Sequence, residues 1–122
     1  MGSGLMAETP ATHGFGLACL AQVLLTRGKA EEALRVAGQA HESLELAGQV
    51  EDGGQLIRLV YAEALAASGR HAEAHAAIRR ARDALLDAAR PIQDPGSRQS
   101  FLDNVPENAR TLALAVEWLG PE

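Results

Sequence analysis

Aromatic residues make up only 3% of this 122-residue chain, and it has a single cysteine, Cys19. The 47% hydrophobic share is mainly Ala and Leu, which favour helices, whereas the β-branched and aromatic residues that favour strands are scarce. One cysteine excludes an intrachain disulfide and is typical of a reducing compartment. We therefore expect an all-α, cytoplasmic protein, and the length is that of one domain.

Long apolar runs and excess positive charge are also missing. No run approaches the ~18–20 residues that span a membrane, so no membrane contact is expected. The formal net charge is −5, which argues against a nucleic-acid partner because such proteins usually carry a basic face. The start of the chain lacks the basic and apolar regions of a secretion signal. We interpret residues 1–10 as a disordered tag or linker and residues 11–122 as a single helical domain.

The chain repeats itself when it is shifted by 41 positions. Leu20-Ala21 then falls on Tyr61-Ala62, and the helix-ending Gly28 falls on Gly69. Small residues fall on small ones and large on large, which is a packing pattern. Apolar residues at helical spacing, with Gly and Pro as stops, predict six helices and no strand. The expected ranges are 12–27, 30–48, 53–68, 71–89, 97–103 and 106–119.

These residues resemble the tetratricopeptide repeat, whose pattern is W-x2-L-G-x2-Y followed by A-x3-F and a further Ala. The matching positions are Leu17, Leu20, Ala21, Leu24, Ala33, Ala37 and Ala40, then Arg58, Tyr61, Ala62, Leu65, Ala74, Ile78 and Ala81. Arg58 departs from the pattern, as does Ala in place of Gly at Ala21 and Ala62, and 41 exceeds the usual period of 34. The resemblance implies an α-solenoid fragment of antiparallel helix pairs, with repeats about 14–48 and 55–90 and capping helices over 97–120.

The family resemblance also implies a function, the binding of a protein or peptide along the first helix of each pair, with no catalysis and no cofactor. Carried over by position, the partner-binding residues are Ala18, Gln22, Leu25, Thr26, Leu56, Leu59, Glu63 and Ala66. This surface is mildly apolar with one acid and suits an apolar or basic segment. The Lys, Arg and Asn with which relatives hold a terminal carboxylate are absent, so a carboxylate clamp is disfavoured.

A second resemblance leaves an alternative open. The stretch from Phe101 to Arg110 is similar to the carboxyl end of large bacterial signalling proteins, in which helical repeats follow a kinase or NTPase domain. It implies a mainly structural role as the C-terminal cap of a longer helical-repeat protein. A further alternative, a helical metal-dependent hydrolase, rests on His71 and His75 one helical turn apart, but no third ligand is evident and no catalytic residue is predicted.

The first helix carries apolar residues in excess of what two repeats can cover. Phe15, Leu17, Cys19, Val23 and Leu25 all lie on it, and about three repeats are usually needed to bury a continuous core. We therefore expect a homodimer through the first helix pair, or a partner bound there.

Overall fold

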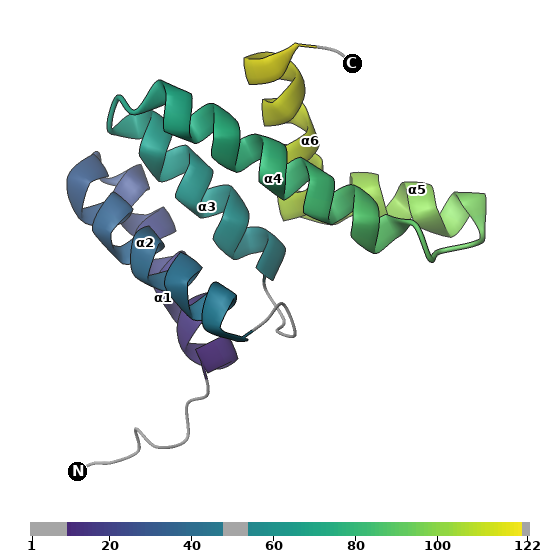
Figure 1. Cartoon of the computed structure of the whole chain (residues 1–122), viewed down its shortest axis with the longest axis horizontal. Helices are drawn as coiled ribbons and strands as arrows, with labels where there is room; N and C mark the ends of the chain where they lie inside the picture. The colour runs from purple at the N-terminus through teal and green to yellow at the C-terminus, as the bar shows by residue number, and fades with distance from the viewer. Residues whose placement is uncertain (1–9, 48–53, 121–122) are drawn as a thin grey trace.

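A computed structural model describes residues 10–47 and 54–120 of the chain (Figure 1). These residues form helices and no strand, which confirms the all-α prediction. The helices are α1 (Pro10–Thr26), α2 (Ala30–Ala47), α3 (Gly54–Ala67), α4 (His71–Ala89), α5 (Pro95–Asn104) and α6 (Pro106–Leu119). Their ends lie within two residues of the expected ones. The tag or linker expected over residues 1–10 lies outside the described residues except for Pro10, which begins α1.

Glycines end α1 and α3 in the same way, 41 residues apart. Gly28 and Gly69 have positive φ angles of 76° and 83°, the left-handed conformation that glycine adopts without strain. The amide after each glycine donates to a carbonyl of the preceding turn, Lys29 to Leu24 and Arg70 to Leu65, both at 2.9 Å. These hydrogen bonds satisfy the last carbonyls of each helix and turn the chain back into the next one. The predicted glycine stops are confirmed.

The first core lies where α1, α2 and α3 meet, because α3 packs against both helices of the first pair. Its buried residues are mostly small: Ala18, Ala21, Ala33, Val36, Ala37, Ala40, Leu44, Leu56, Ile57, Val60 and Ala64. Small residues allow the helix axes to approach closely. At Gly14 the approach is tight, since a Cβ built there would lie 3.1 Å from Ile57 Cδ1.

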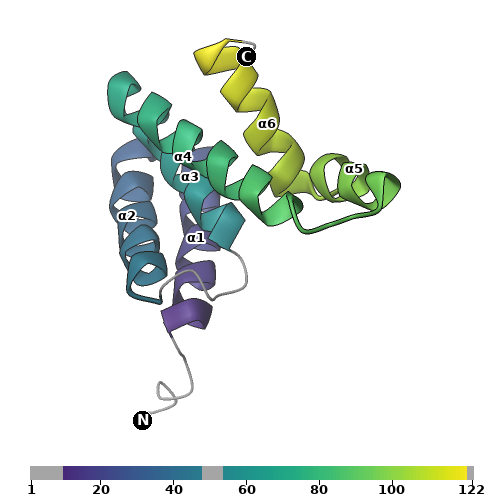
Figure 2. The ribbon, with the colours of Figure 1, turned by 45° about the vertical axis from the view of Figure 1, so that its right-hand side comes forward.

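The second core lies between α3, α4 and α6, and α6 packs on α3 and α4 (Figure 2). Leu59, Ile78 and Leu114 are buried in it. Polar groups supplement this contact. Gln55 Nε2 donates to the carbonyl of Ala81 at 2.9 Å and to Thr111 Oγ1 at 3.5 Å. The position of α6 is therefore fixed by hydrogen bonds as well as by apolar packing.

Helix α5 differs from the others because none of its residues is buried. It extends to the side of the molecule in Figure 1 and contacts α4 and α6. Its N-cap is Asp94, whose carboxylate accepts from the Ser97 amide at 2.8 Å, with Pro95 as the first helical residue. The helix starts two residues before the expected residue 97, because Asp94-Pro95 supplies both a capping side chain and a preset φ.

Candidate partner-binding groove

A groove of about 480 Å³ runs between α1, α3 and α6. It is lined by Gln22, Leu25 and Thr26 of α1, Glu63 and Ala67 of α3, and Arg110, Leu114 and Trp118 of α6. Trp118 is half-buried and Leu114 is almost fully buried. The groove is therefore lined by both apolar and polar side chains, as binding sites for protein segments commonly are.

The groove residues occupy equivalent positions on the three helices. Between α1 and α3 the offset is 41 residues, the period of the repeat, and between α3 and α6 it is 51. At these offsets the lining residues form two rows, one of Gln22, Glu63 and Leu114 and one of Thr26, Ala67 and Trp118. Within each helix the two rows are one turn apart, at i and i+4. The three helices thus present the same face to the groove.

The charges of the groove are balanced. Arg110 Nε lies 3.2 Å from Glu63 Oε2, an ion pair that also ties α6 to α3. The Thr26 hydroxyl donates to the Gln22 carbonyl of its own helix at 2.8 Å. Because Arg110 neutralises Glu63, the single acid expected from the sequence does not favour a basic partner. The Gln22 side chain is exposed and keeps its amide available to a ligand.

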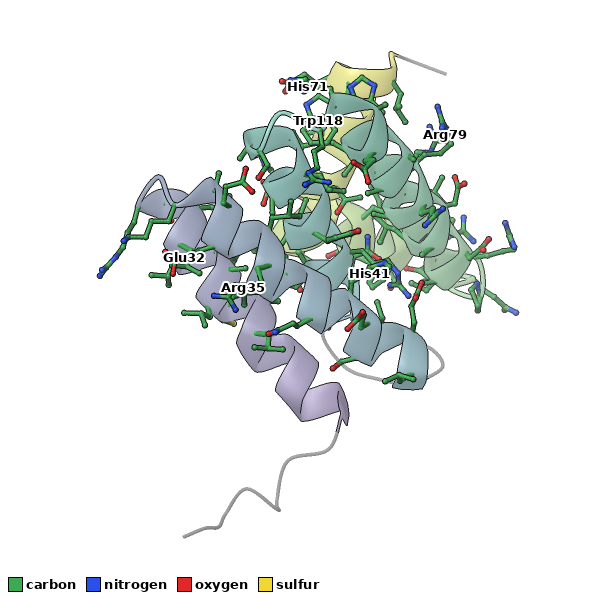
Figure 3. The ribbon with its side chains drawn as sticks, turned by 60° about the vertical axis from the view of Figure 1, so that its left-hand side comes forward. Glu32, Arg35, His41, His71, Arg79 and Trp118 are labelled. Atoms are coloured by element: carbon green, nitrogen blue, oxygen red, sulfur yellow. The ribbon has the colours of Figure 1, made fainter. Side chains whose placement is uncertain are left out.

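Trp118 connects the groove with α4. Its ring stacks on the His75 imidazole, with centroids 5.8 Å apart and planes 18° apart. Figure 3 shows Trp118 and the exposed His71 at the same end of the molecule. His75 is thus engaged with an aromatic ring. Within residues 10–47 and 54–120, no group of three or more His, Cys, Asp or Glu side chains is placed to hold a metal ion.

Four of the eight partner-binding residues expected from the sequence line the groove: Gln22, Leu25, Thr26 and Glu63. A fifth, Ala66, is half-buried beside Ala67 and does not line it. For the other three residues the expectation is corrected. Ala18, Leu56 and Leu59 are 0%, 9% and 3% exposed, so they are core residues and do not line the groove. Ala18 and Leu59 belong to the same helical stripes as Gln22 and Glu63. One turn earlier, Ala18 and Leu59 are buried between the helices, whereas Arg110, the equivalent residue of α6, lines the groove.

Arg110, Leu114 and Trp118 also line the groove but are not among the residues expected from the sequence, which predicts α6 only as a capping helix. The buried face of α6 contains Asn108 and Thr111, which are 3% and 0% exposed. The equivalent residues of α3, 51 positions earlier, are Ile57 and Val60. Polar residues at core positions hide the repeat from a search for apolar spacing. The useful signal was Trp118, the one tryptophan in the chain, since tryptophan is enriched at binding surfaces.

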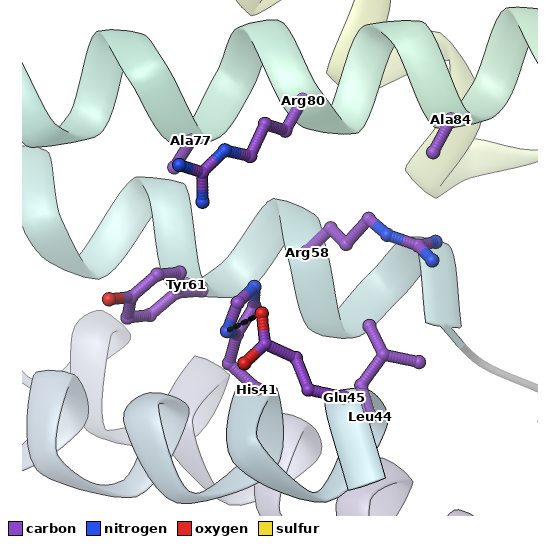
Figure 4. A pocket seen from close by; sticks show the side chains of 8 residues that line it. All are labelled: His41, Leu44, Glu45, Arg58, Tyr61, Ala77, Arg80 and Ala84. Carbon is purple, nitrogen blue, oxygen red and sulfur yellow. Dashed lines mark ion pairs between the residues drawn. The ribbon is translucent and has the colours of Figure 1, made fainter. Parts of the chain in front are cut away.

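A second hollow of about 420 Å³ lies between α2, α3 and α4. Figure 4 shows the His41 imidazole there between the Tyr61 ring and the Glu45 carboxylate. His41 stacks on Tyr61 with centroids 4.5 Å apart, and its Nδ1 lies 3.9 Å from Glu45 Oε2. Burial lowers the pKa of His41 below its usual value. Glu45 opposes this shift, while Arg58 and Arg80 lower the pKa further.

Comparisons with protein-family models, with curated proteins and with solved structures find no match for this chain. None of the helices in the described ranges combines the length and apolar character that a membrane-spanning helix requires.

Proposed function

We propose that this chain is a non-catalytic interaction module of the tetratricopeptide type, which binds a peptide or helical segment of another protein in the groove between α1, α3 and α6. The observation that carries the proposal is that equivalent positions on three helices line one groove. Helix α6 then corresponds to α1 and α3, the first helices of the two pairs. Its contacts support this, since α6 packs on α3 and α4 as α3 packs on α1 and α2.

The lining residues define the chemistry of the bound segment. Leu25, Ala67 and Trp118 suit one large apolar side chain, because buried contacts with tryptophan dominate many interfaces. The exposed Gln22 can donate to and accept from the backbone of the segment. The paired Glu63 and Arg110 leave no net charge to attract a strongly charged ligand. The module therefore selects an apolar anchor flanked by neutral residues.

The experiment uses Trp118 as a built-in reporter. Random peptides displayed on phage are selected against the whole chain, and the enriched peptides are titrated while Trp118 emission is followed. We expect enriched peptides to carry a large apolar residue and to change the emission on binding. Gln22→Arg and Leu25→Asp should weaken binding at least about tenfold, or roughly 1.4 kcal/mol.

Gln39→Arg is the matched control, because Gln39 is also exposed but lies on α2, outside the groove. It should leave the affinity unchanged. Peptides that bind without altering Trp118 emission, and with the same affinity for Gln22→Arg, would contradict the proposal. So would a selection that enriches no binder at all.

A further inference from the structure

Helix α1 presents an uncovered apolar face on the side away from α2 and α3. Phe15, Leu20 and Val23 are 44%, 47% and 48% exposed, and Cys19 beside them is half-buried. Helix α1 carries no Asp, Glu, Lys or Arg from Pro10 to Thr26. An apolar face of a helix in a globular protein normally packs against another element. Contiguous exposed apolar surface commonly marks an interface.

The same face exists on α3, where it is covered. At the 41-residue offset, Phe15, Cys19, Leu20 and Val23 correspond to Leu56, Val60, Tyr61 and Ala64. All four of these α3 residues belong to or pack against the core cluster formed with α1 and α2, and Leu56, Val60 and Ala64 are at most 9% exposed. The chain therefore shows how a face of this composition is buried: a helix pair packs across it.

We propose that the outer face of α1 docks an α-helical hairpin, which packs on α1 as the α1–α2 pair packs on α3. The face continues an existing series of contacts, because α6 packs on α3 and α4, and α3 packs on α1 and α2. The docking hairpin presents small, uncharged residues, as α2 does to α3 through Ala37 and Ala40. A face without charge has no group to offer a charged partner, and burying an unpaired charge against it is costly.

A second copy of this chain is a poor fit to the same face. The surface that covers α3, made by Ala18, Ala37 and Ala40, is itself buried in every copy by that copy's own α3. The α1 face also has a notch at Gly16, where the equivalent residue of α3 is Ile57. A Cβ built at Gly16 would meet nothing within 4 Å. The resulting notch gives the hairpin room for one larger side chain than Ala.

The test places such a hairpin in front of the chain. A second copy of residues 10–53 replaces residues 1–12 and is joined directly to His13. Because His13 is the 41-residue equivalent of Gly54, the connection has the length of the natural α2–α3 connection. If the added pair docks, the loss of helical circular dichroism in the tandem chain has a higher urea midpoint than in the parent. Its denaturant slope should rise by roughly a third, since the slope scales with the surface exposed on unfolding.

Leu20→Asp in the original α1 should cancel the gain in the tandem chain and shift the parent's midpoint little. Leu46→Asp is the control, because Leu46 is 85% exposed on α2 and lies off the α1 face. It should leave the gain intact. An unchanged midpoint in the tandem chain overturns the proposal. So does a parent that forms dimers by light scattering which Leu20→Asp abolishes, because a second copy would then be the occupant.

Discussion

Alanine residues where helices cross set the distance between the helices of this molecule. Ala21 and Ala62 are fully buried, as are Ala33 and Ala74, and the members of each pair are 41 residues apart. Buried alanine contributes less apolar area than buried leucine. It permits close helix approach and loses no side-chain conformational entropy on folding. The two repeats therefore share small residues at the positions where helices pack closely.

Enlarging these alanines should destabilise the fold. We expect Ala33→Leu and Ala74→Leu each to cost roughly 1–3 kcal/mol, because the added atoms have no space at a close crossing. Urea unfolding followed by circular dichroism measures the effect. Ala72→Leu is the control on α4, where the side chain is exposed, and it should change stability by less than about 0.5 kcal/mol. Equal midpoints for all three variants would mean that the crossings are not tight.

The two kinds of glycine in this chain should respond to alanine with opposite signs. Gly69→Ala should cost about 1 kcal/mol, since Gly69 has a φ of 83° that disfavours any Cβ. Gly38→Ala should stabilise the chain by roughly 0.5–1 kcal/mol, because Gly38 lies inside α2 and a Cβ there meets nothing within 4 Å. Thermal or urea unfolding decides both signs. A stabilising Gly69→Ala would be incompatible with the turn described here.

At the scale of elements, local signals made the helices predictable from sequence. Gly28, Gly69 and Pro106 mark helix ends through backbone constraints that act within a few residues. The way helices meet is less predictable, because it depends on contacts between distant residues. Asn108 and Thr111 illustrate this: both are buried in α6, Asn108 donates to the Phe101 carbonyl at 2.9 Å, and Thr111 donates to the Glu107 carbonyl at 2.7 Å. Because these two buried residues are polar, the apolar spacing of the sequence does not identify α6 as one side of the groove.

The junction of α2, α3 and α4 should weaken as the pH falls. The folded chain lowers the pKa of His41 below 6.5, through burial first and then Arg58 and Arg80, against the opposing effect of Glu45. Between the lowered pKa and 6.5 the unfolded chain therefore binds more protons than the folded one. The contribution of His41 to stability is complete above the usual pKa and is lost as the pH falls through this window. Urea unfolding at a series of pH values from about 8 down to about 5 measures this loss of stability.

His41→Gln provides the comparison for this pH dependence. The variant lacks the titrating group, so its stability should fall less over the same pH range than that of the parent chain. Identical slopes for both chains would show that other groups, and not His41, cause the loss.

The whole molecule has two junctions between helix pairs, which we call joints: α3 packs on α1 and α2, and α6 packs on α3 and α4. The two joints differ in polarity. The joint of α3 with α1 and α2 is apolar, with Ile57 and Val60 at 0% exposure. In the joint of α6 with α3 and α4, Asn108 and Thr111 take the equivalent places, and Gln55 bridges α3 to Ala81 and Thr111. Burying an Ile or Val side chain contributes about 1.5–3 kcal/mol. A hydrogen bond that replaces one to water contributes less, about 0.5–1.5 kcal/mol net. The α6 joint is therefore the weaker one.

This asymmetry predicts the order in which the molecule opens. With rising urea, α6 should separate from α3 and α4 before the first three helices unfold, because regions with little buried apolar surface open first. Trp118 lies on α6 and is the chain's one tryptophan, so its emission should shift to longer wavelength at a lower urea concentration than the loss of helical circular dichroism. Gln55→Ala should widen the gap between the two midpoints, because it removes the hydrogen bonds to Ala81 and Thr111. Coincident midpoints in both chains would instead mean that the polar joint is as strong as the apolar one, and that the groove remains closed on its α6 side until the whole molecule unfolds.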